Sequence, residues 1–197
     1  MRISIRGKVL LVGACMLAGV GAWGQQTPTP VQSPTQYLEV AVVYNPAMTK
    51  AVGGDNFWMQ GGSVQVHGQF WHGVGAVADV AGLHTADTGS GVGLDLVSAT
   101  FGPRYTWAPA RRRYSAFGQV LVGEAYGMNS IFPKTTGASD SANSVAVQIG
   151  GGVNVSLRHR LAVRAFEAEW LRTQLPNSTT NVQNNLRLGA GLALRFK

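Results

Sequence analysis

Cysteine, charge and long apolar runs are all scarce in this chain. The single cysteine, Cys15, lies in a segment that we expect to be removed on export. Disulfides and thiolate metal sites are therefore excluded from the mature protein. Charged residues make up 13% of the sequence, against about a quarter in soluble domains. After residue 24 no stretch approaches the roughly 20 apolar residues that a transmembrane helix needs, which excludes a helical membrane protein.

Apolar residues and glycine are plentiful instead. Hydrophobic residues account for 45% of the 197 positions, and 26 are glycine. The apolar residues are dispersed, with small or polar residues between them. This pattern favours a single domain built on a sheet that meets lipid on one face and carries small and polar groups on the other.

The first 24 residues have the pattern of a cleaved export signal. Arg2, Arg6 and Lys8 precede an apolar stretch over 9–20, and Ala22-Trp23-Gly24 places small residues at the cleavage positions, before Gln25. Cleavage would lower the net charge from +7 to +4, because it removes three basic residues and no acidic one. A lipoprotein signal ending at Cys15 is the alternative, but the apolar run continues past that cysteine.

Residues 25–36 (QQTPTPVQSPTQ) are rich in Pro, Thr and Gln. Such a composition cannot form a paired strand or bury a core, so we expect an extended periplasmic leader there. The folded domain is then predicted over 37–197.

From Tyr37 onward the hydrophobic period is two. Eight strands are predicted, over about 37–44, 63–71, 74–82, 95–107, 114–126, 145–157, 161–172 and 186–196. The strand over 145–157 alternates Val, Ile and Leu with Ala, Gln, Gly, Asn and Ser. Each strand therefore has an apolar face and a polar or small face.

The polar face includes arginines, which a dry core accepts only with partners. This predicts an all-β, eight-stranded, antiparallel up-and-down transmembrane barrel whose lumen is filled by side chains. A soluble barrel of the lipocalin type would reverse the faces. It is disfavoured because its outer surface would then be crowded with arginines.

The connections alternate between long polar loops and short turns. Short turns follow Trp71, Trp107 and Leu157, whereas the other four connections have about a dozen residues or more. Outer-membrane barrels have short periplasmic turns and long outer loops, so an even strand count puts both ends of the barrel on the periplasmic side.

Aromatic residues cluster near the predicted strand ends. We expect interfacial girdles near the two membrane surfaces, formed by Tyr37, Trp71, Tyr105, Trp107, Tyr114 and Phe196 below and by Tyr44, Tyr126 and Trp170 above. The register of the strands over 114–126 and 161–172 stays open. Arg164 either reaches the lower interface from the apolar face or marks a β-bulge.

The sequence resembles the OmpA-type and OmpX-type eight-stranded outer-membrane barrels. The stretches that carry the resemblance are 71–79 (WHGVGAVAD), 101–105 (FGPRY), 150–155 (GGGVNV) and the closing segment 186–196. It covers about 37–197 and implies a bacterial outer-membrane location in a barrel-only member without the family's peptidoglycan-binding domain. Family members end on an aromatic residue that the barrel-assembly machinery recognises; here the aromatic residue is Phe196, and Lys197 follows it, which departs from the family pattern.

Several charged residues are predicted to face the lumen and to pair there, since buried charges need partners. This network comprises Glu39, Asp79, Arg104, Arg187 and Arg195, with Glu124, Glu167 and Glu169 on strands whose register the pattern leaves open. A structural plug is the favoured interpretation of the network, and a gated path through the lumen is the alternative.

Enzymatic and cofactor signatures are weak. His84, Asp87 and Ser90 share one outer loop but form a poor triad, because nothing in the sequence orients the histidine. Four scattered histidines do not predict a metal site. Gly89 to Gly93 is a glycine-rich loop with no helix after it. We therefore expect no enzyme activity, cofactor or metal, and no nucleic-acid partner for the basic turn 111–113.

The predicted outer loops at 45–62 and 127–144 are polar and glycine-rich, with Phe57 and Trp58 as exceptions that meet the outer interface or form an adhesive contact. The sequence predicts a monomeric barrel, surrounded by outer-membrane lipids, with a structural or surface-interaction role through its loops and a possible extracellular ligand. A narrow channel for ions or small solutes is the alternative, and a lipid A-modifying enzyme is the third hypothesis.

Overall fold

A computed structural model describes residues 36–50, 56–88, 91–109, 112–158, 160–177 and 180–196. The predicted export signal and all of the predicted leader except Gln36 lie outside these residues. Among the described residues, no helix has the length and apolar character to cross a bilayer.

Eight long strands form the domain, as the two-residue period predicts. They are β1 (Tyr37–Tyr44), β3 (Asn56–Trp71), β4 (Val74–Thr85), β5 (Leu94–Trp107), β6 (Tyr114–Met128), β9 (Ala142–Ser156), β10 (Leu161–Thr173) and β11 (Gln183–Phe196). Three short strands complete the list: β2 (Ala47–Lys50), β7 (Phe132–Pro133) and β8 (Ala138–Ser139). Strand β2 extends the line of β1, because both pair with β3 on one side and β11 on the other.

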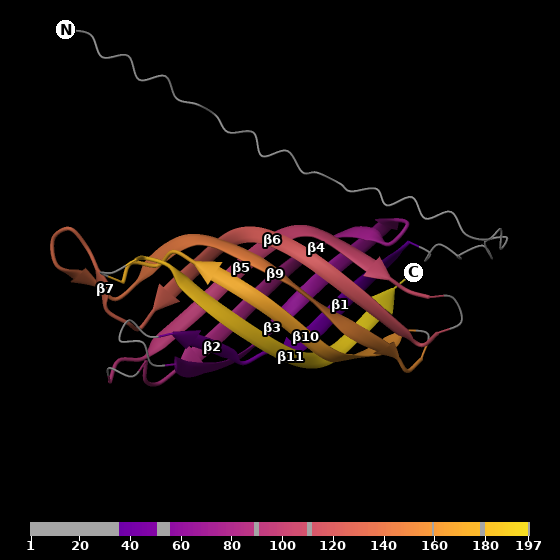
Figure 1. Cartoon of the computed structure of the whole chain (residues 1–197), viewed down its shortest axis with the longest axis horizontal. Helices are drawn as coiled ribbons and strands as arrows, with labels where there is room; N and C mark the ends of the chain where they lie inside the picture. Colours follow the sequence, from indigo (N-terminus) through magenta and orange to yellow (C-terminus); the bar gives the residue numbers. More distant parts are fainter. Residues whose placement is uncertain are drawn as a thin grey trace, which may run out of the picture. The chain divides into compact units, whose positions relative to one another are not determined.

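The sheet closes on itself. Its order is β1-β11-β10-β9-β6-β5-β4-β3, and β1 also pairs with β3, with every pairing antiparallel. Figure 1 shows the tilted strands wrapping around a common axis. The predicted up-and-down barrel is therefore confirmed, and closure leaves no unpaired edge in the wall.

Hydrogen-bonded rows climb toward the long-loop end as they pass around the wall. Tyr44 at the end of β1 pairs with Gly62 in the middle of β3, and the same row continues through Gly82, Val97 and Tyr126 to Asn143 at the outer end of β9. This stagger is the consequence of strand tilt in a closed barrel.

The ends of the barrel differ as expected. The starts of β1, β6 and β10 and the ends of β5, β9 and β11 lie at the short-turn end (Figure 1). The turn between β3 and β4 has two central residues, His72 and Gly73, with φ of 41° and 85°. Positive φ at both positions is the twist-matched hairpin geometry. A Cβ at Gly73 would lie 2.4 Å from the carbonyl oxygen of Thr106, so only glycine fits.

Two sequence predictions are corrected at the level of elements. The predicted outer loop 45–62 is largely strand, because β2 and the first half of β3 extend the wall and only 51–55 separates them. Phe57 and Trp58 therefore belong to β3. Trp58 is half exposed, whereas Phe57 packs on the apolar cluster inside the barrel mouth.

The open register in β10 is settled by a bulge. The pairing of β10 with β9 and β11 shifts after Arg164, which places Ala165 and Phe166 together on the outer face. The bulge allows Arg164, Glu167 and Glu169 all to point inward.

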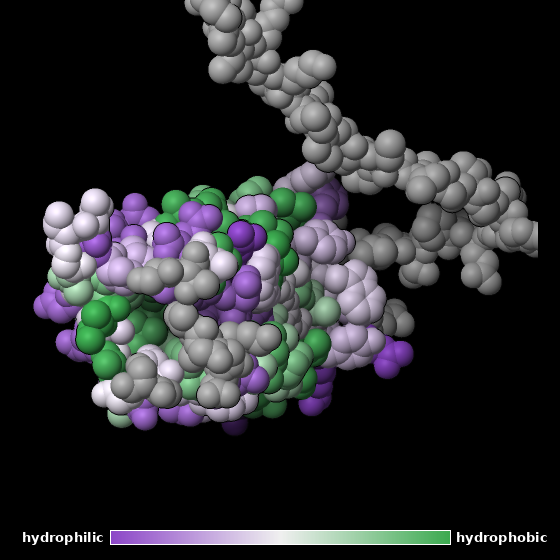
Figure 2. Space-filling view, turned by 60° about the vertical axis from the view of Figure 1, so that its left-hand side comes forward, coloured by the Kyte–Doolittle hydropathy of each residue, from purple (hydrophilic) through white to green (hydrophobic). Residues whose placement is uncertain are grey.

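The strands have apolar outer faces and polar inner faces over most of their length. Exposed outer residues include Val42, Val64, Val80, Phe101, Val122 and Ile149. Figure 2 shows hydrophobic residues spread over the barrel wall. This inverted polarity is that of a barrel whose wall meets lipid, and the protein is a membrane-spanning barrel of the outer-membrane type.

The polarity reverses at the outer end. There the inner side carries an apolar cluster, the apolar cap, formed by Ala47, Met59, Leu83, Leu96, Ala125, Phe132, Ala146, Leu171 and Leu175. The outer side at this level carries polar residues, among them Gln60, His84, Asp95, Asn143 and Asn184. The wall therefore continues beyond the lipid as a barrel with an ordinary apolar core.

Candidate functional site

The interior of the barrel below the apolar cap is polar and tightly filled. Four arginines and four carboxylates point into it from the described strands: Arg104, Arg164, Arg187, Arg195, Glu39, Asp79, Glu167 and Glu169. Their formal charges cancel. Cancellation is a condition for burying so many ions, because an unpaired charge in a low-dielectric interior is very costly.

Glu39 is the centre of the lower layer. It is a β1 residue that lies directly opposite Arg195 of β11, at the seam where the barrel closes. Arg195 Nε donates to Oε2 over 2.7 Å, and Arg164 Nη2 donates to Oε1 over 3.1 Å. Arg104 Nη1 lies 3.6 Å from the same Oε1. One carboxylate thus serves three guanidinium groups from three different strands.

One aromatic ring contacts two of these cations. The guanidinium carbons of Arg104 and Arg164 lie 4.2 and 4.6 Å from the centroid of the Phe117 ring. A guanidinium group at this distance from a ring face is attracted by the ring quadrupole. Phe117 therefore contributes a favourable cation–π contact to each of the two arginines.

Glutamines connect the charges into layers. Gln65 accepts from both Arg104 and Arg164 and donates to Glu167 Oε1 over 2.7 Å. Gln119 accepts from Arg104 Nε over 2.7 Å and donates to Glu169 Oε1 over 2.5 Å. An amide can do both because it carries a donor and an acceptor.

The upper layer is built around Arg187 and Gln148. Arg187 Nη1 donates to Asp79 Oδ2 over 3.2 Å and lies 3.5 Å from Glu169 Oε2. Gln148 Nε2 donates to Glu169 over 2.7 Å and to Asp79 over 3.2 Å. Several atoms here, namely Asp79 Oδ1, Glu169 Oε2 and Arg187 Nε and Nη2, have no hydrogen-bond partner among the described residues.

The structure brings most of the predicted lumen residues together. Glu39, Asp79, Arg104, Glu167, Glu169, Arg187 and Arg195 all point inward. Each lies in an ion pair given above, except Glu167, which accepts from Arg164 Nη1 over 2.9 Å. Glu124 does not. It is exposed on the outer face of β6, because the inward residues of that strand are the odd-numbered ones, from Ser115 to Ala125. The prediction that Glu124 faces the lumen was wrong.

The predicted aromatic girdles need one correction. Trp71, Tyr105, Trp107, Tyr114, Trp170 and Phe196 are exposed on the outer face. Tyr37 instead points inward. Its ring packs edge-on against His67, with the centroids 5.8 Å apart, and lies 5.3 Å from the guanidinium carbon of Arg195. It shares the inward parity of Glu39, which the strand period of two already implied.

Sequence reasoning missed the bridging residues. Alternation places Gln65 and Gln148 on the polar faces of their strands, but their role between charges depends on which strands meet across the lumen. Gln119 and Phe117 lie on β6, whose register the pattern left open. If Tyr114 is taken as an outward-facing residue, alternation alone places Phe117 and Gln119 inside the barrel.

His84 lies near the end of β4, not in a loop, and its orienting partner comes from the neighbouring strand. The ring Nδ1 contacts Asp95 of β5, and the other oxygen of that carboxylate accepts from Asn129. Of the two residues considered with His84 as a poor triad, Asp87 accepts a hydrogen bond from the backbone of Gly91 through Oδ1, and Ser90 lies outside the described residues. No group of three or more His, Cys, Asp or Glu suited to a metal occurs in the described part of the chain.

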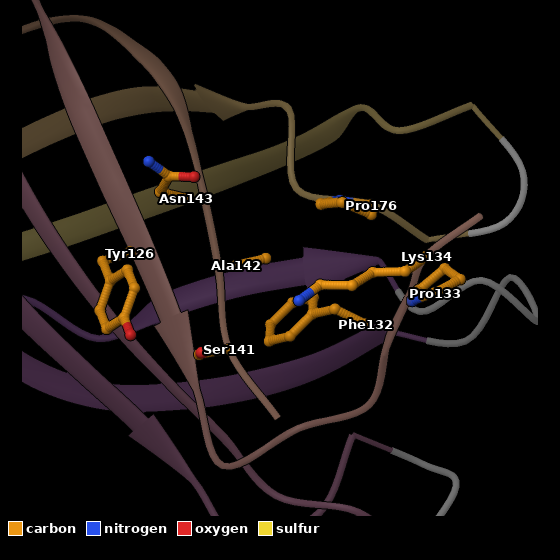
Figure 3. Close-up of a pocket in the computed structure, with 8 residues that line it drawn as sticks. All are labelled: Tyr126, Phe132, Pro133, Lys134, Ser141, Ala142, Asn143 and Pro176. Carbon is orange, nitrogen blue, oxygen red and sulfur yellow. The ribbon is translucent and has the colours of Figure 1, made fainter. Parts of the chain in front are cut away.

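A shallow hollow lies on the outer side, beside the β7–β8 hairpin. It measures about 420 Å³. Figure 3 shows Phe132 and Lys134 of the hairpin, Tyr126 of β6, Asn143 of β9 and Pro176 of the β10–β11 connection around it. Aromatic, amide and amine groups thus converge at the long-loop end of the barrel.

Solved structures of small barrels resemble this fold. Neisserial surface protein A aligns with a TM-score of 0.60 at 13% identity, over 82% of this chain and 97% of that one. The Ail protein of Yersinia pestis, in complex with the heparin analogue sucrose octasulfate, aligns with a TM-score of 0.53 at 17% identity, over 82% and 99%. OprG of Pseudomonas aeruginosa aligns with a TM-score of 0.50 at 8% identity, over 82% and 96%.

The chain has the fold of the eight-stranded outer-membrane barrels. No family model and no curated protein sequence matches it. At these identities the structural likeness concerns the fold, so the role of the barrel has to be argued from its own residues.

Proposed function

We propose that the protein is a closed outer-membrane barrel that acts at the cell surface through its outer connections, with a lumen that does not conduct. The observation that carries this proposal is the filled interior. Arg104, Arg164 and Arg187 have relative exposures of 2%, 0% and 1%. A continuous water-filled path along the axis would leave arginines of the lumen solvated, so their burial supports a plug.

The apolar cap adds a second barrier. Phe132 of the hairpin and Leu175 of the β10–β11 connection close over Met59, Leu83 and other residues of the wall. An ion entering from outside would have to leave water and cross this cluster before it met the charges below. Such a transfer is unfavourable for a bare ion.

The outer connections are the surface that remains for a partner. They are rich in Ser, Thr, Asn and Gly, and their described charges are few: Asp87, Lys134 and Asp140. A polysulfated ligand would need clustered cations, which the described connections do not provide. The hollow beside Tyr126 and Phe132 fits a neutral polar ligand better, with aromatic faces and amide groups for contact.

Planar bilayer recording tests the plug. We expect the purified barrel to give no steady conductance above that of the bare bilayer. The variant Arg187→Ala is recorded for comparison, because it keeps the barrel but removes a buried side chain from the upper layer of the lumen. Steady single-channel steps from the unmodified protein would contradict the proposal.

A narrow channel is the second candidate, and one observation favours it. The unpartnered atoms of Asp79, Glu169 and Arg187 lie in one layer of the lumen. Polar atoms left unpaired in a protein interior are commonly hydrated. If this layer holds water that connects to either end, Arg187→Ala should increase conductance strongly from a measurable starting value. If the lumen is closed, Arg187→Ala should leave the conductance at the level of the bare bilayer.

Surface interaction is tested on cells that express the protein. Binding to arrays of immobilised glycans and extracellular-matrix proteins is compared with that of a variant in which 132–139 are replaced by a Gly-Ser linker. A replacement in the periplasmic turn after Leu157 is the control. We expect the hairpin variant alone to lose binding. Equal binding by all three proteins, or none by the unmodified barrel, would contradict a role for this surface.

A further inference from the structure

Charged side chains are rare on the outer face of the barrel. Among the Asp, Glu and Arg residues whose side chains are described in the strands, those that point outward are Asp95, Glu124 and Arg172. Asp95 is paired with His84 and accepts a hydrogen bond from Asn129. Glu124 and Arg172 have no hydrogen-bond or ion-pair partner within the described part of the chain. Two opposite charges on the wall are therefore unmatched.

These two residues flank a single strand. Glu124 of β6 is in register with Val145 of β9, and Arg172 of β10 is in register with Val147 of β9. Hydrogen-bonded rows climb in this direction around the wall. The strands are tilted by about 40° and spaced about 4.8 Å apart. On the next strand, the residue at the same height along the membrane normal therefore lies about 1.2 residues below the register partner. The two-residue offset between Glu124 and Arg172, over two strand steps, puts them at nearly the same level.

We propose that a second copy of this chain binds the face formed by β6, β9 and β10, with a two-fold axis along the membrane normal near β9. Both copies are inserted in the same direction, so a rotation about the normal keeps every residue at its level. It exchanges the two sides of β9. Glu124 then faces Arg172 of the second copy, and Arg172 faces its Glu124. This is the self-complementarity that a two-fold interface requires.

The surface below the two charges permits close contact. Gly118, Gly151 and Ala168 lie in one register row across β6, β9 and β10, on the outer face. Small residues let membrane-embedded backbones approach closely and gain van der Waals contact. Apolar Val122 and Ile149 lie just above this row on the same face. The same face thus offers an apolar contact area and a pair of complementary charges.

Lipid headgroups are the alternative partner of these charges. A phosphate group would satisfy Arg172, but a carboxylate among anionic headgroups is repelled. Glu124 is therefore the residue that favours a protein partner. The proposal is independent of the closed lumen and of any loop ligand, and it replaces the monomer expected from the sequence.

Cysteine cross-linking in membranes tests the axis. In a Cys15→Ser background, Val145→Cys places a thiol close to its own copy across the axis, whereas Val64→Cys is the matched control. Val64 is 47% exposed, against 54% for Val145, and its strand β3 is four strands from β9 in either direction. We expect mild oxidation to give a disulfide-linked dimer from Val145→Cys alone. Equal yields from the two variants, or none from either, would overturn the proposal.

Charge reversal tests the pairing. In the Val145→Cys background, Glu124→Arg or Arg172→Glu alone places like charges together twice across the interface, and we expect most of the cross-linked dimer to be lost. The double variant Glu124→Arg/Arg172→Glu should restore it. A yield that is unchanged by the single reversals, or that is lost equally in the double variant, would assign these residues to lipid contacts and refute the interface.

A steric block provides a test without charge changes. A Cβ at Gly118 would have its nearest neighbour at 3.9 Å, and one at Gly68 on β3 would have none within 4 Å, so both sites accept a side chain without disturbing the fold. We expect Gly118→Trp to abolish cross-linking through Val145→Cys and Gly68→Trp to leave it intact. Loss in both variants, or in neither, would contradict the proposed face.

Discussion

Glu39 of the first strand and Arg195 of the last strand meet across the line where the barrel closes, with Arg195 Nε donating to Glu39 Oε2 over 2.7 Å. The same carboxylate also serves Arg164 and Arg104. Closure of the wall and neutralisation of the lumen therefore depend on one residue. This relationship gives the first of four predictions about stability.

Replacing Glu39 by glutamine should destabilise the barrel strongly. The amide keeps the shape but leaves three guanidinium groups without their shared counter-ion. Breaking a buried ion pair by removing one partner costs about 3–5 kcal/mol. The measurement is the urea dependence of unfolding in lipid vesicles, followed by gel mobility without boiling. Asp140→Asn, in an exposed connection, is the control and should change stability by less than about 0.5 kcal/mol. Similar stabilities for both variants would contradict the account.

Replacing an arginine of the lumen by lysine should cost more stability where the guanidinium group is fully buried than where it is partly exposed. The Arg164 guanidinium contacts Gln65, Asn154, Glu167 and Glu39, and its side chain is fully buried. The Arg195 side chain is 20% exposed at the periplasmic mouth. A lysine retains the charge but not the planar fork of donors. Arg164→Lys should therefore lower the urea midpoint clearly more than Arg195→Lys does, and the reverse order would contradict the assigned contacts.

The apolar cap should loosen when Phe132 is truncated. Its side chain is 5% exposed, whereas that of its neighbour Ile131 is 66% exposed. Phe132→Ala removes buried ring contacts, with a cost of up to about 3 kcal/mol because the hairpin can relax. Limited proteolysis from the outer side should then cleave 129–141 faster than in the unmodified protein. Ile131→Ala should leave the cleavage rate unchanged, and equal rates for the two variants would argue against the cap.

Two glycines with positive φ should respond differently to alanine. Gly73 has φ of 85° and little space for a Cβ, whereas Gly137 has φ of 90° and open surroundings. Gly137→Ala should cost about 1–2 kcal/mol through backbone strain alone. Gly73→Ala adds the clash with the Thr106 carbonyl, so its urea midpoint should fall further. Equal losses would mean that the periplasmic turn is not held against β5 as the structure shows.

The fold was predictable because one physical pattern runs through the chain. Strands of a lipid-facing barrel must alternate, and the valine, isoleucine and leucine residues of 145–157 alternate with small and polar residues, with one glycine, Gly151, on the apolar face. The limits of β3 were not predictable in the same way. Asn56 to Gly62 is rich in glycine and polar residues, which is typical of a loop, and it becomes strand only because β2 and β4 supply hydrogen-bonding partners.

The interior was predictable as a set of charges but not as a network. Inward parity identifies Glu39 and Arg187 from their own strands. It cannot identify which strand lies across the lumen, so Gln65, Gln119 and Gln148 could not be assigned as bridges. The prediction for Glu124 was wrong for another reason. The sequence did not determine the register of its strand, and a shift of one residue exchanges the inward and outward faces. The bulge after Arg164 is a similar local event, which alternation can suggest but not locate.

Methyl-resolved NMR of the barrel in lipid nanodiscs tests the central claim most directly. The side chains of Val64 and Val80, on strands β3 and β4 away from the proposed dimer face, point outward, whereas those of Val77 and Leu121 point inward with 0% and 1% exposure. A paramagnetic label on the lipid chains should broaden the first two signals and leave the second two sharp. A water-soluble gadolinium chelate should leave Val77 and Leu121 sharp as well. Broadening of Val77 and Leu121 by the chelate would show an open lumen, and a Val80 signal that the lipid label leaves unchanged would contradict the lipid-facing wall.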